Sequence, residues 1–509
     1  MWPRFTFYDF RVIGHYLGIL ILLSSFAMLI PLITGVVFQE WIAASHYLLT
    51  IGFSLIVGSA LRFLMVSPGK LNHQQALAVT GLSWITLAFI ASIPLFLSGH
   101  YLSYLDALFD GVSGLTTTGI TVIQDVNHLS NADNMWRFIM QFAGGLGLIV
   151  VALSFGLFGK RGAGANLYAS EGRSEHVVPN IVQTARLISR IALFVVFIAT
   201  IVIAGFCLAS GIEPARAALQ GFWLAISGFM TAGFSPMSES IMYYRSFGIE
   251  VVVMILMIVG SVSFALHAEI WKGRTNHFFR DLEIRTALLW VAVMMIVLAA
   301  ALTASAYFSD LLSMLRRGVF MAVAAFTTTG FQNVTTNQLT TAFSSGAILT
   351  LAMVMAIGGS AGSTSGGIKL RRLGIIGKSV IVTIKEALAP DSARVVVDYN
   401  HVGRRLVSPQ VVKEAMTVFA LFIITYAIGT LAGIAHGYEA TQAIFESVSM
   451  ASNGGLSLGI TTGGMPASLE VIYIIMMWAG RLEFVALLAL FVEVIVSFRP
   501  RKRLKAKKA

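Results

Sequence analysis

Long apolar runs dominate this sequence and constrain its fold more than any other feature. A helix needs about 20 apolar residues to cross the hydrocarbon core of a bilayer, and backbone inside that core must satisfy its own hydrogen bonds. Ten runs of this kind occur, near residues 12–38, 43–66, 76–98, 135–158, 184–210, 247–270, 282–308, 344–378, 411–434 and 468–497. We therefore predict an all-α polytopic membrane protein in contact with membrane lipid.

Composition supports this class and excludes others. Hydrophobic residues make up 57% of the 509 residues and charged residues 12%, whereas soluble proteins carry roughly 25% charged residues. A cytosolic enzyme and a nucleic-acid-binding protein are excluded on this basis. The single cysteine, Cys207, excludes an intrachain disulfide. The first apolar run lacks a small-residue cleavage site, so we expect a retained helix rather than a signal peptide.

The basic residues set the expected orientation. The formal net charge is +11, and Lys and Arg concentrate in alternate loops and in the tail 499–509. Because loops rich in Lys and Arg stay on the cytoplasmic side, we expect these loops and both termini to face the cytoplasm. A topology signal is the favoured interpretation of the tail, and docking of an anionic partner is the alternative.

Four shorter, semi-apolar stretches lie between the runs, at 104–117, 215–231, 314–328 and 440–452. Each is too short to cross a bilayer and leads into Gly-, Thr- or Ser-rich sequence, which is typical of a re-entrant half-helix followed by irregular backbone. Alignment of the four places Gly119, Gly233, Gly330 and Gly455 at one position. We therefore predict four parallel helix–pore-loop–helix repeats around a pseudo-fourfold axis, plus an N-terminal two-helix hairpin.

This repeat divides the chain into six parts. The expected parts are the hairpin at 1–70, repeat 1 at 71–160 with pore loop 104–121, repeat 2 at 161–275 with pore loop 215–236, repeat 3 at 276–390 with pore loop 314–333 and an intramembrane gate loop at 358–367, repeat 4 at 391–498 with pore loop 440–459, and the basic cytoplasmic tail 499–509.

The glycine loops have the composition of a cation-selectivity filter. Backbone carbonyls can replace the hydration shell of a cation, and Gly adopts the necessary backbone angles at low cost. Thr hydroxyls would add oxygen ligands, and the negative ends of the half-helix dipoles would face the ion. The filter segments lack an acidic ring, which argues against a divalent cation. The predicted ion-binding filter residues are Thr117, Thr118, Gly119, Thr231, Ala232, Gly233, Thr328, Thr329, Gly330, Asn453, Gly454 and Gly455.

A Gly- and Ser-rich segment interrupts the run 344–378. A helix there would lose about 1 kcal/mol per interior Gly relative to Ala, so we predict an intramembrane loop, with close helix packing through small residues as the alternative. Arg481 lies in another apolar run, where a charge is costly and therefore suggests function. A salt bridge to Glu483 is not expected, because residues i and i+2 do not face each other on a helix. The predicted gate residues are Gly358, Gly359, Ser360, Gly362, Ser363, Thr364, Gly366, Gly367 and Arg481.

Other polar residues receive less specific interpretations. We expect N-capping, rather than ion attraction, from the acids that precede the half-helices, Asp106, Glu213, Asp310 and Glu439. Asp110 and Glu446 lie further in and are candidates for drawing cations toward the mouth. The spacing of His128, His267 and His436 does not indicate a metal site, so we expect interfacial or packing roles.

Six motifs carry a resemblance to a known family. They are LTTTGITVI at 115–123, WRFIMQFAGGLGLIV at 136–150, FTTTGF at 326–331, GGSAGSTSGGIK at 358–369, GGLSLG at 454–459 and GRLE at 480–483. The chain resembles the Trk/Ktr/HKT superfamily of potassium transporters, and the N-terminal hairpin indicates its TrkH-like branch.

The resemblance implies K+ as the transported ion, with no cofactor. It also implies a gate at 358–367 with Arg481 below the filter and Lys369 nearby. It further implies a homodimer in a bacterial inner membrane and a TrkA-type cytosolic nucleotide-binding regulatory subunit.

Three alternatives stay open. The fourth loop departs from the pattern at Ser452 and Asn453, so a Na+/K+ pathway is one alternative to K+ uptake, and H+- or Na+-coupled symport is another. The segment Gly111–Gly114 resembles the motif of intramembrane serine proteases, but that reading leaves the fourfold repeat unexplained. The segment Gly358–Gly362 matches G-x-S-x-G without the strand–turn–helix context of a nucleophile elbow. We therefore do not expect an enzyme.

Overall fold

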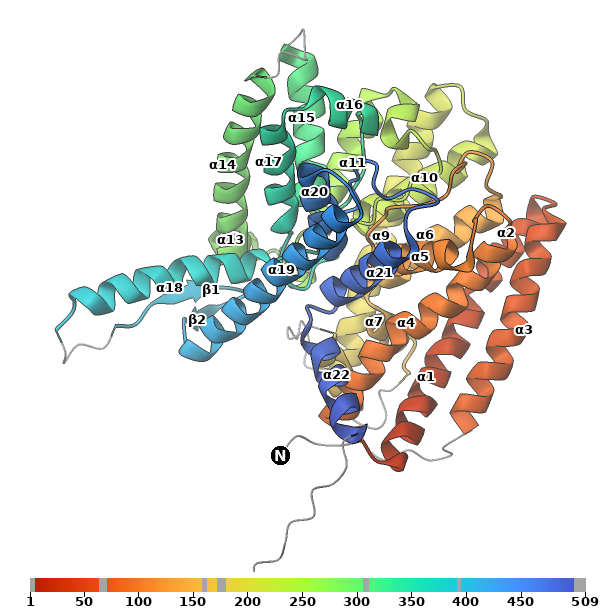
Figure 1. Cartoon of the computed structure of the whole chain (residues 1–509), viewed down its shortest axis with the longest axis horizontal. Helices are drawn as coiled ribbons and strands as arrows, with labels where there is room; N and C mark the ends of the chain where they lie inside the picture. Colours follow the sequence, from red (N-terminus) through yellow and green to blue (C-terminus); the bar gives the residue numbers. More distant parts are fainter. Residues whose placement is uncertain are drawn as a thin grey trace, which may run out of the picture.

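The computed structural model describes residues 5–63, 71–157, 163–171, 180–304, 311–390 and 395–498, and most of them are helical (Figure 1). Asp310 and the basic tail 499–509 lie outside these residues. Within the described ranges, six helices are long and apolar enough to cross a membrane, or eight if each of two bent pairs is one span. The prediction of an all-α polytopic membrane protein is confirmed.

The N-terminal segment forms two antiparallel arms at one edge of the molecule (Figure 1). Its helices are α1 (Phe7–Ala27), α2 (Leu29–Val37) and α3 (Trp41–Phe63). A Cβ added at Gly18 of α1 would lie 2.6 Å from the carbonyl oxygen of Gly58 on α3. Glycine is therefore what lets these two helices approach so closely, as is common between membrane helices.

Each of the four following units contains a long first helix, a short buried half-helix and a broken second helix. The first helices are α4 (His73–Leu97), α9 (Ile181–Ala209), α14 (Leu282–Ala304) and α19 (Pro409–Ala435). The half-helices are α5 (Tyr104–Leu115), α10 (Pro214–Phe229), α15 (Leu311–Phe326) and α20 (Ala440–Ala451). Further short elements are α8 (Ala163–Ser170), η2 (Ser240–Tyr244), α13 (Thr275–Arg280) and α16 (Thr336–Ala342).

Three of the second helices correct the expectation of continuous spans, at 135–158, 247–270 and 468–497, whereas the interruption of 344–378 was predicted. Two of them bend sharply, by 87° and by 100°. The span at 468–497 breaks at Glu483 and Phe484, which both have positive φ, and the predicted irregular loop separates the two helices within 344–378. The resulting pairs are α6 (Asn131–Leu146) with α7 (Leu148–Ser154), α11 (Phe247–Gly260) with α12 (Phe264–Trp271), α17 (Ser345–Ala356) with α18 (Leu370–Leu388), and α21 (Ala467–Arg481) with α22 (Val485–Phe498).

The three other breaks were not predicted, because apolar composition indicates burial or lipid contact and does not show that a helix is continuous. Backbone amides freed by a break still need partners, and local groups supply them. The Glu171 carboxylate accepts from the amide of Ile149 at 3.2 Å, and the Ser263 hydroxyl accepts from the amide of Ala265 at 3.2 Å. Broken backbone at this depth is therefore stable because it is packed inside protein.

A short β-hairpin, also absent from the all-α prediction, precedes α19. Strands β1 (Asp398–Asn400) and β2 (Arg404–Leu406) pair antiparallel, with Asp398 opposite Leu406. The Arg404 guanidinium donates to the Asp398 carboxylate and holds the pKa of that carboxyl below its usual range. The hairpin lies between α18 and α19, which project together from the body (Figure 1).

Candidate ion filter and gate

The four half-helices end at the four glycine loops. Residues 106–115 of α5 are all buried, as are residues 445–451 of α20. By contrast, only 17% of the apolar window of α14 is buried within the protein. The half-helices therefore lie in the interior, α14 presents most of its apolar surface to lipid, and the negative ends of four helix dipoles meet at the loops.

The four loops share one backbone pattern. The residue two positions before each aligned glycine has positive φ: 57° at Thr117, 48° at Thr231, 52° at Thr328 and 54° at Asn453. The glycines themselves have φ of 77°, 82°, 88° and 72° at Gly119, Gly233, Gly330 and Gly455. The sequence analysis assigned unusual angles to glycine alone. Because a left-handed β-branched residue costs roughly 1–2 kcal/mol, the surrounding structure must impose this conformation on the threonines.

The aligned glycines form a closed ring. A Cβ added at Gly119 would lie 1.9 Å from the Ala232 carbonyl oxygen, and one at Gly233 would lie 2.1 Å from that of Thr329. In the same way, a Cβ added at Gly330 would lie 2.8 Å from the Gly454 carbonyl oxygen. One added at Gly455 would lie 2.0 Å from the Thr118 carbonyl oxygen. Each loop therefore touches the next, and the fourth touches the first. The structure brings all twelve predicted filter residues together around one axis.

Several polar side chains of the filter loops bond to other protein groups. Thr118 Oγ1 bonds Thr116 Oγ1 at 2.8 Å, and Thr329 Oγ1 bonds Thr327 Oγ1 at 2.7 Å. The Asn453 amide donates to Thr118 Oγ1 at 3.0 Å and to the Met477 carbonyl at 2.9 Å. These side chains tie the loops to their surroundings, whereas the buried Thr117 Oγ1 has no hydrogen-bond partner in the described structure and stays a predicted ligand beside the backbone carbonyls.

The predicted gate residues form an irregular loop where the half-helices end. Thr364 Oγ1 lies 3.0 Å from Thr231 Oγ1 and donates to the Gly260 carbonyl at 2.9 Å, while the Gly366 amide donates to Thr328 Oγ1 at 2.7 Å. The Ala361 amide donates to the Glu283 carboxylate at 2.8 Å. Residues 358–367 are not helical, which excludes the alternative of a continuous helix packed through small residues.

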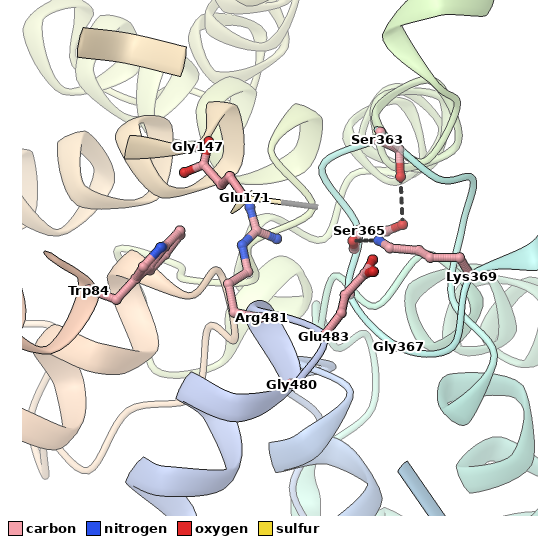
Figure 2. Close-up of a pocket in the computed structure, with 12 residues that line it drawn as sticks. Trp84, Gly147, Glu171, Ser363, Ser365, Gly367, Lys369, Gly480, Arg481 and Glu483 are labelled. Atoms are coloured by element: carbon pink, nitrogen blue, oxygen red, sulfur yellow. Dashed lines mark hydrogen bonds between the residues drawn. The ribbon is translucent and has the colours of Figure 1, made fainter. Parts of the chain in front are cut away.

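Arg481 connects this loop to the end of α6. Its guanidinium donates to the Thr364 carbonyl at 2.8 Å and to the carbonyls of Gly144 and Gly145, and its Cζ lies 5.6 Å from the Trp84 ring centroid. As expected, Glu483 does not pair with Arg481 in the described structure, and it forms an ion pair with Arg372 instead. The Lys369 ammonium donates to the Ser365 carbonyl (Figure 2).

A cavity lies beside Arg481, and charged groups of both signs line it. Figure 2 shows the Arg481 guanidinium beside Glu171, with Lys369 and Glu483 across the cavity. The sequence analysis missed Trp84, Glu171 and Arg372, because nothing in their local sequence marks them. Gly147, which lies in the family-like segment 136–150, has a φ of 93° and begins the α6–α7 break.

The acidic residues near the mouth are structural. Asp110 is fully buried and accepts from Tyr101 Oη at 2.9 Å and Arg137 Nε at 3.3 Å. Glu446 is fully buried and accepts from the amides of Leu458 and Ile460 and from the Thr461 hydroxyl. Both carboxylates are enclosed and bonded to protein, which argues against direct contact with an ion, and their electrostatic attraction of cations stays a prediction.

The capping expectation is partly right. Asp106 occupies the third position of a capping box whose N-cap is Ser103. Glu213 and Glu439 lie at the N-cap positions of α10 and α20, where the described structure shows no side-chain cap bond. The histidines have local partners: His128 pairs with Asp125, His267 bonds the Val259 carbonyl, and His436 bonds Ser468.

Removing the buried Asp110 charge is expected to destabilise the protein strongly. Arg137 is fully buried, lies 4.1 Å from the Phe234 ring centroid and pairs with Asp110. Asp110→Asn would leave that guanidinium uncompensated, at a cost of about 3 kcal/mol. The measurement is the thermal unfolding midpoint of the purified protein in detergent. Asp125→Asn, which alters an exposed ion pair with His128, is the control and should leave the midpoint nearly unchanged. Equal midpoints for both variants would contradict the prediction.

Comparison with known proteins agrees with this geometry. A family model described as "TrkH: Cation transport protein" matches residues 44–497. The chain is 32% identical over 493 residues to an uncharacterized cation transporter of Methanocaldococcus jannaschii, with 96% of each chain covered. It is 28% identical over 500 residues to the Trk system potassium uptake protein TrkH of Halomonas elongata, covering 94% of this chain and 98% of that protein. The crystal structure of the potassium transporter TrkH from Vibrio parahaemolyticus has the same fold, with a TM-score of 0.81 and 24% identity over 96% of this chain and 100% of that chain.

Proposed function

Because the chain belongs to the TrkH family of cation transport proteins, we propose that it mediates potassium uptake across the cytoplasmic membrane of a bacterium. The observation that carries the proposal is the closed ring from Gly119 through Gly233 and Gly330 to Gly455. The same uptake is named for its Halomonas elongata relative.

In the proposed mechanism, a K+ ion exchanges its water for carbonyl oxygens of the four loops. Four half-helix dipoles stabilise the positive charge without an acidic ring, so the ion can also leave. The fourth loop has the same backbone pattern as the others, with Asn453 at 54° and Gly455 at 72°. This regularity favours K+ selectivity over the Na+/K+ pathway.

In the same proposal, the loop 358–367 is the gate. It bonds to the filter loops through Thr231 and Thr328 and is tied to α6 by Arg481. A fixed positive charge there opposes a cation leaving the filter. Opening requires the loop to release the Arg481 bonds.

We further propose a homodimer regulated by a TrkA-type cytosolic nucleotide-binding subunit, with both termini in the cytoplasm. The family resemblance and the Lys- and Arg-rich loops support this arrangement. Basic residues of α18 and the hairpin, including Arg371, Lys378, Lys385 and Arg405, would offer that subunit a positive surface.

The test is uptake of radioactive Rb+ into proteoliposomes of the purified protein, with K+ or Na+ as competitor. We expect K+ to block uptake and Na+ to have little effect. Equal competition would contradict K+ selectivity and support the Na+/K+ pathway. Imposed H+ or Na+ gradients then test coupling, since a symporter would accumulate Rb+ when the gradient is its only driving force.

A further inference from the structure

We propose that Asp281, Glu283 and His401 form a binding site for one divalent transition-metal ion of the zinc class. The three side chains come from the start of α14 and from the turn between β1 and β2, and all three are buried. Figure 1 shows α13, which leads into α14, beside the β-hairpin. The sequence analysis missed this group because 118 residues (401 minus 283) separate the histidine from the nearer acid.

The separations of the donor atoms suit a metal ion. His401 Nδ1 lies 3.1 Å from Asp281 Oδ2 and 3.9 Å from Glu283 Oε2, and the three donor atoms all lie within 4.8 Å of one another. Zinc bonds of about 2.0–2.2 Å place two tetrahedral ligand atoms roughly 3.3 Å apart. One ion between the three atoms would therefore need only small side-chain movements.

The donor types also point to this class of metal. Imidazole nitrogen suits zinc and its neighbours, whereas all-oxygen sites suit magnesium and calcium. A histidine–aspartate ion pair without a metal is the simpler interpretation of the same residues. A proton on His401 Nδ1 can point at one carboxylate, but two carboxylates approach this nitrogen from separate residues. A metal ion can contact all three donors at once.

The backbone holds both carboxylates in place. Asp281 accepts from the Glu283 amide at 2.8 Å and from the Val402 amide at 3.4 Å. Glu283 Oε1 accepts from the Ala361 amide of the loop 358–367 at 2.8 Å, while its Oε2 faces His401. A bound metal would thus join the β-hairpin to that loop through one carboxylate. The consequence for gating rests on the proposed function, whereas the binding site does not.

The experiment measures metal binding by the full-length protein purified in detergent and treated with chelator. Zn²⁺ is titrated by calorimetry, with Mg²⁺ as the comparison ion, for the wild type, His401→Gln and His436→Gln. His436 is the matched control, because it follows the C-terminal end of α19, whereas His401 precedes the N-terminal end of that helix. We expect one Zn²⁺ per chain for the wild type and His436→Gln, and affinity at least tenfold lower for His401→Gln. Mg²⁺ should bind far more weakly.

Absence of stoichiometric Zn²⁺ binding by the wild type, or equal Zn²⁺ affinity in both variants, would overturn the proposal and leave an ion pair. If His401→Gln does not fold, the absorption spectrum of Co²⁺ added to the wild type distinguishes the metal site from an ion pair. Intense visible bands of low-coordinate Co²⁺ that Zn²⁺ abolishes support the site, and their absence refutes it. Neither readout uses transport, so failure of the proposed potassium uptake would leave this result unaffected.

Discussion

Gly119→Ser is expected to lower both K+ uptake and the preference for K+ over Na+ by at least tenfold. A serine Cβ would lie 1.9 Å from the Ala232 carbonyl oxygen, so one of the two loops must move. The φ of 77° is also unfavourable for serine. A loss of about 1.4 kcal/mol in the difference between the K+ and Na+ binding free energies lowers selectivity by a factor of ten. Even a modest displacement of one carbonyl is therefore sufficient to produce the expected loss. The measurement is Rb+ uptake into proteoliposomes with K+ and Na+ as competitors.

The matched control is Gly211→Ser, which separates backbone strain from contact with the filter. Gly211 has a φ of 83°, but a Cβ there has no atom within 4 Å in the described structure. We expect its uptake and selectivity to match those of the parent. Unchanged selectivity in Gly119→Ser would remove Gly119 from the filter, and an equal loss in both variants would point to general destabilisation.

Arg481→Ala is expected to raise K+ flux through the protein without its regulatory partner, on the order of tenfold. The substitution removes a charge that opposes a cation by about 2 kcal/mol at a separation of roughly 8 Å and an effective dielectric constant near 20. It also removes the bonds from the guanidinium to Thr364 and Gly144, which hold the loop 358–367 to α6. Initial rates of Rb+ uptake at matched protein amounts measure the effect.

Arg481→Lys distinguishes these two causes. Lysine keeps the charge but lacks the planar guanidinium that reaches both carbonyls. Flux that stays low in Arg481→Lys indicates an electrostatic barrier, and flux that rises as in Arg481→Ala indicates release of the loop. Arg404→Ala, which removes an exposed arginine of the hairpin, is the control for loss of a positive charge. Parent-like flux in Arg481→Ala would exclude Arg481 from the gate.

Several features of the fold could be predicted because they depend on short-range chemistry. The half-helices were expected at 104–117, 215–231, 314–328 and 440–452, and α5, α10, α15 and α20 lie within a few residues of these limits. An apolar stretch that is too short to cross a bilayer and ends at glycine is compatible with few structures other than a re-entrant half-helix. The interruption after α17 followed in the same way from the helix-breaking composition of 357–367.

The breaks in the other second helices were not predicted, because each falls at only a few Gly, Ser or charged residues (143–147, 260–263 and 480–484) within a long apolar run. The left-handed conformation of Thr117, Thr231 and Thr328 was missed for a related reason. Local preference opposes it, and contacts with residues far away in the sequence impose it. The burial of Asp110 and Glu446 also depends on long-range packing, since their partners include Arg137 and residues 457–461.

The sequence by itself thus determined that this protein is an all-α membrane protein with a fourfold repeat of half-helix and glycine loop, because hydrophobic length and backbone permissiveness are local properties. Only the tertiary structure decided which carbonyl faces each glycine, which groups hold the loop 358–367 and Arg481, and that His401 lies beside Asp281 and Glu283. Those contacts join residues from tens to hundreds of positions apart, and they form only when the repeats close around one axis.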